Sequence, residues 1–159
     1  MRLLDASAIL DLWENYPIGQ FPTVWAWIEG EILNGELAIP RVALEEVGFR
    51  DPGCKTQLEK YGIKEFGIGN DEAYEALQIK SALGIVNDNY HKSGVDENDI
   101  LIIAIAKTQG VDLITHEAKQ PSLPSPMAKY KIPATCSMPQ VNVRTLRMID
   151  YIKLSGKVF

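Results

Sequence analysis

Cysteine is scarce in this sequence. Only two of its 159 residues are cysteines, Cys54 and Cys136, and no C-x-x-C spacing is present. A zinc ribbon, which needs four such ligands, is therefore excluded. We expect both cysteines to be reduced thiols, and we predict a cytoplasmic protein.

Long apolar runs are also absent. The longest, from Ile100 to Ala106, is far too short to span a bilayer, so we expect no contact with a membrane. The amino-terminal run MRLLDASAILDLW has an acid at position 5, where a signal peptide would have an uncharged apolar core. We therefore expect no signal peptide.

Positive charge is in deficit. Lysine and arginine number 16 against 21 acidic residues, which gives a net charge of -5. This excludes a domain whose whole surface binds nucleic acid, but not a nuclease, because carboxylates of an active site add negative charge that bound cations offset. Any basic strip must be local. Two sets of residues are candidates: Lys55, Lys60 and Lys64, or Lys129, Lys131, Arg144, Arg147, Lys153 and Lys157.

The pattern of apolar residues predicts one globular α/β domain over residues 1–159. We predict strands at Met1–Asp5, Glu36–Ile39, Val111–Thr115 and Ile132–Ala134. We predict helices at Ala6–Trp13, Phe21–Leu33, from Pro40 to about Val47, Asp71–Tyr90, Asp96–Gln109 and Val143–Leu154. Residues 51–69 fit a short helix with a loop or strand, and Ala118–Lys129 fits a loop. Strands separated by helices favour a mostly parallel sheet with helices on both faces.

The fourth of these helices has a predicted buried face. Its inward residues are expected to be Tyr74, Leu77, Ile79, Leu83 and Val86.

Two acids follow predicted strands, where ligand chemistry gathers in a parallel sheet. Asp5 ends the first strand and Glu117 follows Val111–Thr115, whose Thr115 can donate a hydroxyl to a carboxylate or a phosphate. Position alone leaves alternatives open, because Asp5 or Ser7 could be a helix N-cap and Glu117 an ordinary loop acid.

Further acids stand at helix positions. Asp96 is a plausible N-cap and Asp99 lies three residues later, as in a capping box, so both could simply serve the helix. However, seven apolar residues follow Asp99, which predicts a buried helix. Of Glu45 and Glu46 only one can face a given point, and both could instead be solvated.

Together these carboxylates suit a divalent cation. Mg²⁺ and Mn²⁺ prefer carboxylate oxygens, and acids that converge without a cation repel one another and raise their pKa values. A cation removes that conflict, positions a phosphate and lowers the pKa of a bound water.

Four motifs in order resemble those of PIN-domain ribonucleases. They are residues 4–10 (LDASAIL), 39–47 (IPRVALEEV), 99–106 (DILIIAIA) and 113–117 (LITHE). The sequence is also similar to a PIN-like branch catalogued as a domain of unknown function, through Phe21-Pro22, Trp25, Trp27, Thr115-His116-Glu117, and Lys131-Ile132-Pro133 before Cys136. Most PIN nucleases have aspartate where this chain has Glu117, and Ala6 replaces a usual hydroxyl residue.

The resemblance implies a three-layer α/β/α domain that hydrolyses RNA phosphodiester bonds with Mg²⁺ or Mn²⁺ and an activated water. It implies that Asp5, Glu46, Asp99 and Glu117 are catalytic and bind the metal. Ser7 and Thr115 would support them, and Asp96 and His116 would flank the site. It further implies that the chain could be the toxin of a toxin–antitoxin pair, with an antitoxin protein as partner, and could form a homodimer.

Several other functions compete with this interpretation. A haloacid-dehalogenase-type phosphatase would have a second aspartate where this chain has Ser7, and the paired acids and late lysine of a receiver domain are not evident. A catalytically weak or inactive PIN-like binding module, held by a protein partner, remains the alternative. Trp13, Trp25 and Trp27 could stack on bases, but their helical spacing favours core or dimer packing.

Overall fold

Five short strands form a parallel sheet at the centre of the molecule. The computed structural model describes residues 1–159, and the strand order is β3-β2-β1-β4-β5 with every neighbouring pair parallel. The strands are β1 (Arg2–Leu4), β2 (Leu37–Pro40), β3 (Lys64–Phe66), β4 (Asp112–Ile114) and β5 (Thr145–Leu146). Because β1 is central, the residue that follows it is flanked by strand ends on both sides.

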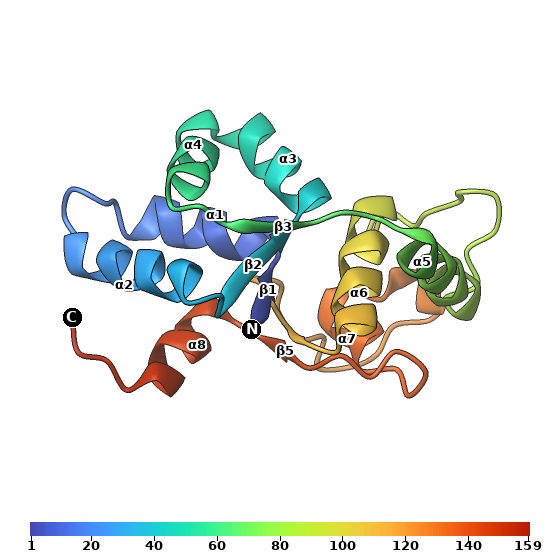
Figure 1. The fold of residues 1–159 in the computed structure, drawn as a ribbon. Coiled ribbons are helices and arrows are strands. Elements are labelled where there is room, and N and C mark those ends of the chain that lie inside the picture. The colour runs from blue at the N-terminus through green and yellow to red at the C-terminus, as the bar shows by residue number, and fades with distance from the viewer.

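Helices cover both faces of the sheet, which confirms the three-layer α/β/α architecture. In Figure 1, α1, α2, α4 and α8 lie on the left of the strands and α5, α6 and α7 on the right. Helix α3 contacts both α1 and α6 at the top of the view. The helices are α1 (Ala6–Asn15), α2 (Pro22–Leu33), α3 (Arg41–Arg50), α4 (Pro52–Lys60), α5 (Asn70–Ala82), α6 (Glu97–Gln109), α7 (Ile132–Cys136) and α8 (Met148–Ser155), with a short 3-10 turn at Met127–Lys129.

The hydrophobic core is one continuous cluster of 41 buried residues. It includes Leu3 and Leu4 of β1 and the first three residues of β2, as is typical of parallel strands covered on both faces. Neither cysteine forms a disulfide, and burial raises the pKa of each thiol to about 12. None of the helices combines the length and apolarity that a membrane crossing requires.

Helix α6 forms where the sequence predicts it. Asp96 is its N-cap, and the side chain of Asp96 accepts a hydrogen bond from the Asp99 amide. The helix ends at Gly110, whose φ of 62° is left-handed and suits glycine. The apolar body after Asp99 is almost wholly buried, as expected.

Two predicted elements near the carboxyl terminus are wrong. Ile132–Ala134 lies in α7 and not in a strand, because Pro133 falls in the first helical turn, where no amide hydrogen bond is lost. The first part of the predicted helix Val143–Leu154 is not helical, because Thr145 and Leu146 pair with β4 and form β5. Only Met148–Ser155 is helical.

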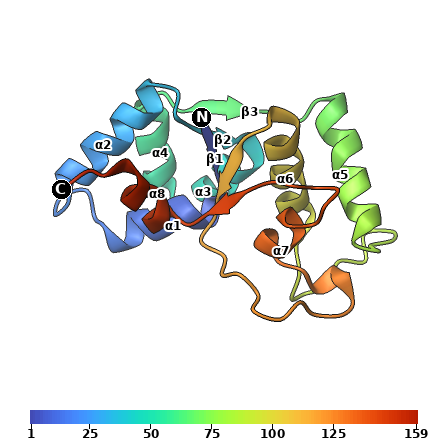
Figure 2. The same cartoon turned by 90° about the horizontal axis from the view of Figure 1, so that it is seen from below.

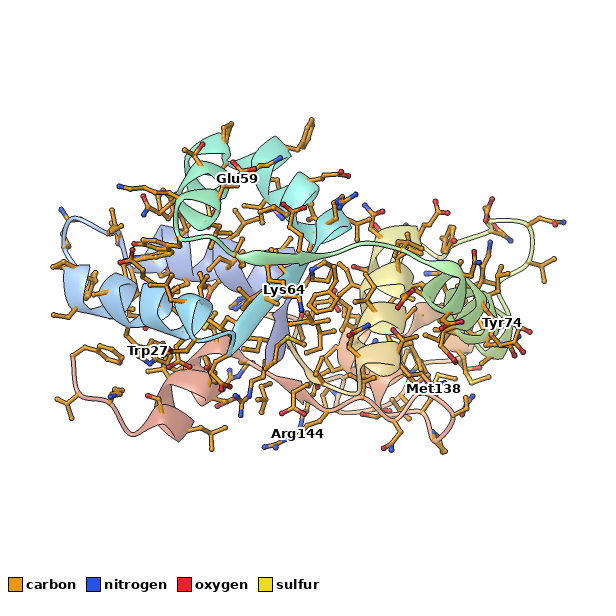
Figure 3. All side chains as sticks on the ribbon, in the orientation of Figure 1. Trp27, Glu59, Lys64, Tyr74, Met138 and Arg144 are labelled. Atoms are coloured by element: carbon orange, nitrogen blue, oxygen red, sulfur yellow. The ribbon has the colours of Figure 1, made fainter.

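Helix α5 is shorter than predicted and turns a different face inward. It ends at Ala82, and Tyr74, Leu77 and Val86 are 64%, 62% and 66% exposed. Tyr74 lies at the outer right of Figure 3. The inward residues are Ala76, Ile79 and Leu83, a narrow strip that packs on α6.

Pro40 is the last residue of β2 and the N-cap of α3, so it precedes the first turn that we predicted for it.

The tryptophans belong to the packed interior of the α1/α2 layer. Trp25 is 1% exposed, packs edge-on against Trp13 at a centroid distance of 5.3 Å, and donates its Nε1–H to the Tyr16 carbonyl at 2.6 Å. Trp27 packs against Tyr151 on α8. These contacts favour packing over base stacking.

Candidate metal and active site

Asp5 stands at the carboxyl end of the central strand. It is 4% exposed, and its amide donates to the Ile114 carbonyl of β4 at 2.8 Å. Its Oδ2 accepts hydrogen bonds from the hydroxyls of Ser7 and Thr115, the latter at 2.9 Å. No lysine, arginine or histidine forms an ion pair with Asp5. The buried carboxylate thus has neutral hydrogen-bond donors around it and no cation paired with it.

Backbone amides orient both hydroxyls. The His116 amide donates to Ser7 Oγ at 3.0 Å, and the Glu117 amide donates to Thr115 Oγ1 at 3.2 Å. Each hydroxyl oxygen therefore accepts from the loop after β4 and gives its single proton to Asp5. These bonds fix the start of α1 to the end of β4.

Asp99 and Asp96 form a reciprocal capping box. The Asp96 amide donates to Asp99 Oδ2 at 2.9 Å, and the Asp99 amide donates to Asp96 Oδ1 at 3.0 Å. The Oδ1 of Asp99 makes no hydrogen bond. The capping interpretation of Asp99 is thus confirmed, and its second oxygen stays free of hydrogen bonds, as a ligand role would require.

Glu117 and Glu46 approach from two further elements. Glu117 Oε2 accepts from the Ile132 amide at 2.7 Å, which ties the loop after β4 to the start of α7. Glu46 on α3 is half-buried, whereas the adjacent Glu45 is exposed. Arg50 is 3.8 Å from Glu46 and leaves its Oε2 unpaired.

The acids influence one another's protonation. Burial, and then the charges of Asp96, Asp5 and Glu117, raises the pKa of Asp99 to about 7 against the hydrogen bond from the Asp96 amide. Burial, followed by the charges of Asp5 and Asp96, also raises the pKa values of Glu46 and Glu117. For Asp5, burial raises the pKa and the two hydroxyls partly offset it. These five acids therefore form one electrostatic cluster, which we call the acid cluster.

The acid cluster fits a hard divalent cation by its chemistry. Its donors are carboxylate oxygens whose repulsion a cation would relieve, and Asp99 and Glu117 each keep one oxygen free of hydrogen bonds. No three acidic, histidine or cysteine side chains lie close enough together to chelate an ion directly. Mg²⁺ meets this condition, because it retains several waters and needs only one or two direct carboxylates.

His116 lies at the rim of the acid cluster. Its side chain is 58% exposed, and its Nδ1 is 3.3 Å from Asp11 on α1. Asp96 is exposed as well and serves as the cap of α6.

Sequence reasoning missed two contributors to the acid cluster. The Ile132 amide holds Glu117, and the charge of Lys131 lowers the pKa of that glutamate. The Lys131-Ile132-Pro133 run, with proline near a helix start, could have indicated this contact. The prediction of a strand there excluded it, because only a helix start leaves amides free to donate to Glu117.

Residues 3–159 match the family described as "Domain of unknown function (DUF4411)". The chain belongs to this family. No curated protein sequence matches the chain.

Solved structures share the fold at low sequence identity. PAE2754 from Pyrobaculum aerophilum is 16% identical with a TM-score of 0.58, over 98% of this chain and 97% of that one. VapBC2 from Rickettsia felis, bound to a promoter DNA fragment, is 14% identical with a TM-score of 0.53, over 92% and 97%. A toxin–antitoxin complex from Klebsiella pneumoniae is 15% identical with a TM-score of 0.52, over 92% and 96%. The chain therefore shares the fold of these structures, and a PIN-like fold is what its four motifs predicted.

Proposed function

We propose that this chain is a divalent-metal-dependent endoribonuclease that hydrolyses RNA phosphodiester bonds at the acid cluster. The observation that carries the proposal is the burial of Asp5 without a cation, at the strand end where the charges of Asp5 and Asp96 raise the pKa values of Glu46, Asp99 and Glu117. Perturbed acids that share one region are typical of functional sites.

The residues divide the work between holding and orienting. Asp5, fixed by Ser7 and Thr115, is the rigid anchor for Mg²⁺ or Mn²⁺. Glu46, Asp99 and Glu117 would complete the ligand set, and the contacts of Asp99 with Asp96 and of Glu117 with the Ile132 amide set the positions of these two acids. When bound, the cation neutralises the phosphate and lowers the pKa of a water. The water gives up a proton and its oxygen bonds to phosphorus as the P–O3′ bond breaks, and the departing O3′ takes up a proton, which leaves a 5′-phosphate and a 3′-hydroxyl.

Cleavage of a mixed single-stranded RNA with Mn²⁺ tests the proposal. We expect Asp99→Asn to lower the cleavage rate by about a hundredfold or more, because the interactions of a bound metal supply several kcal/mol. The carboxamide oxygen of the substituted side chain can still accept the hydrogen bond from the Asp96 backbone amide, so the helix cap is retained. Glu97→Gln is the matched control: it removes the same charge from the exposed side of the same turn, and we expect a change of at most about twofold.

Two results would reject the enzyme. Equal cleavage by wild type and Asp99→Asn at saturating Mn²⁺ would mean that the acid cluster takes no part in the reaction. No cleavage by either protein, with or without chelator, would favour the alternative, a catalytically weak or inactive binding module held by a protein partner.

The biological setting is also a proposal. The fold shared with two toxin–antitoxin structures supports a toxin with an antitoxin partner. The two free, buried thiols support a reducing cytoplasm, and the continuous core supports a single domain over residues 1–159. Co-purification from the native cell and light scattering test for the antitoxin and for a homodimer.

A further inference from the structure

A large groove opens beside the acid cluster. Its volume is about 1040 Å³, and it is lined by the loop after β4, by α7 with the residue after it, and by β5 with α8. Figure 2 shows β5 passing between α7 and α8. Thr115 and Glu117 line the groove and also belong to the site around Asp5, so groove and site are continuous.

The groove is basic although the chain is acidic. Four of its lining residues are lysine or arginine, and two are acidic, Glu117 and Asp150. The basic residues are Lys119, Arg144, Arg147 and Lys153. Three of them belong to the second of the two basic strips that the sequence offered. The lining of the groove has a net charge of +2, so the rest of the chain carries -7, and the groove attracts anions.

These cations are available to a ligand. The side chains of Arg144 and Arg147 are 64% and 57% exposed, and their pairs with Asp112 (3.7 Å) and Asp150 (3.3 Å) are surface pairs, which are weak. Lys119 and Lys153 are exposed and form no ion pair. Exposed arginines beside a site that repels anions have a clear physical use, which is to bind the charges of a substrate next to the reacting phosphate.

A second hollow makes the ligand more specific. It has a volume of about 340 Å³ and shares Lys119, Pro133 and Ser137 with the groove. Its other lining residues include Leu123, Met127 and Tyr130. Cations next to an apolar and aromatic surface match a single strand, whose phosphates contact the cations and whose unpaired bases pack on the apolar side chains.

We propose that this groove binds the backbone of single-stranded RNA on one side of the scissile phosphate, through Arg144, Arg147, Lys153 and Lys119. The inference rests on the proposed function for the identity of the substrate. It adds the path of the strand, from the acid cluster along β5 and α8. Contacts of this kind bind phosphates irrespective of base.

Paired charge variants test the path. Arg144→Ala/Arg147→Ala removes two positive charges from the groove, and Lys60→Ala/Lys64→Ala removes two from the end of α4 and the start of β3. The strands β5 and β3 form opposite edges of the sheet, and Figure 3 labels Arg144 and Lys64. Both variants have the same net charge, so a general loss of attraction affects them equally.

We expect the groove variant to raise KM for an oligouridine substrate by about tenfold with kcat nearly unchanged. It should also make the slope of log affinity against log salt shallower by about 1.4, from about -3 for four contacts. Arg144→Lys/Arg147→Lys should restore the slope, and thermal melts confirm that each variant folds. The control should keep both KM and slope.

Binding of labelled oligouridine to Asp99→Asn, measured by fluorescence anisotropy, separates the two proposals. If wild type cleaves RNA and the groove and control variants behave alike, the path is wrong and the nuclease stands. If wild type does not cleave but only the groove variant loses oligouridine binding, the path stands and the nuclease is wrong. If the groove variant binds oligouridine normally but no longer binds polyglutamate, the groove serves an acidic protein, and the path is overturned.

Discussion

Acidic side chains at the amino end of the sheet form ion pairs with arginine, whereas at the carboxyl end burial and neighbouring acids raise their pKa values. Around Arg2, Glu36 and Asp112 lie 4.0 and 3.8 Å from the guanidinium, which also stacks on the Tyr151 ring at 4.8 Å. Around Asp5 the hydrogen bonds come from hydroxyls, and the charge of Asp5 raises the pKa of the neighbouring Asp99. Both ends are built from the same five strands, so the sheet does not impose the difference.

The comparison separates charge that stabilises the fold from charge that the fold must tolerate. At the amino end each acid has a partner within the chain, so nothing external is needed. At the carboxyl end burial and mutual repulsion disfavour the ionised acids in the folded state. These acids therefore cost stability in the cation-free chain, and the proposed cation would offset that cost.

Adding a divalent cation to the acid cluster should have the largest effect on the difference between the two ends of the sheet. We expect Mg²⁺ or Mn²⁺ at a hundredfold excess over its Kd to stabilise the fold by about 2.7 kcal/mol. The Tm should rise by several degrees, measured in thermal melts against KCl of equal ionic strength. Asp5→Asn should abolish the rise. A rise that is equal with K⁺, or that persists in Asp5→Asn, would place the cation elsewhere.

For each pH unit, protonation should weaken the contrast by a smaller amount. The pKa of Asp99 is raised from 3.8 to about 7, so between these values the folded state binds more protons than the unfolded chain. The free energy of unfolding of the metal-free protein should therefore increase as pH falls from about 7 toward 4, by at most about 1.4 kcal/mol per pH unit from this group. Urea titrations across this window should show a smaller slope for Asp99→Asn. Identical slopes would mean that Asp99 ionises normally.

Neutralising one acid at each end should give effects of opposite sign. Asp112→Asn removes partners of Arg2 and Arg144, so we expect a loss of under about 1 kcal/mol that shrinks at high salt. Asp99→Asn should instead stabilise the metal-free protein at pH 7. Denaturant midpoints of the two variants measure both changes in stability. If both substitutions stabilise the protein, or both destabilise it, the two ends of the sheet do not differ in the way described.

The sequence predicted best where one signal was local and strong. Asp96 as a cap, the apolar run after Asp99, and Gly110 define α6 without any help from the rest of the chain. The position of Asp5 followed from the rule that parallel strands end at one edge. The four acids of the motifs lie in one electrostatic cluster, although their roles remain proposals.

The sequence predicted poorly where distant partners decide the structure. The sequence around Thr145 and Leu146 predicts a helix, but these residues form a strand because they pair with β4. The pattern of α5 predicts that Tyr74 and Leu77 are buried, but only Ala76 and Ile79 of this helix are buried against α6. The contact of Glu117 with the Ile132 amide joins residues fifteen positions apart and has no sequence pattern of its own. The sequence limited the candidate basic strips to two sets of residues. The fold shows that the second set contributes to the groove.

The hydroxyls of Ser7 and Thr115 have one further consequence. Because each gives its only proton to Asp5, the innermost part of the site presents oxygen lone pairs and no donor to an incoming phosphate. Cation and RNA should then bind cooperatively, and by thermodynamic linkage each should increase the affinity for the other by the same factor.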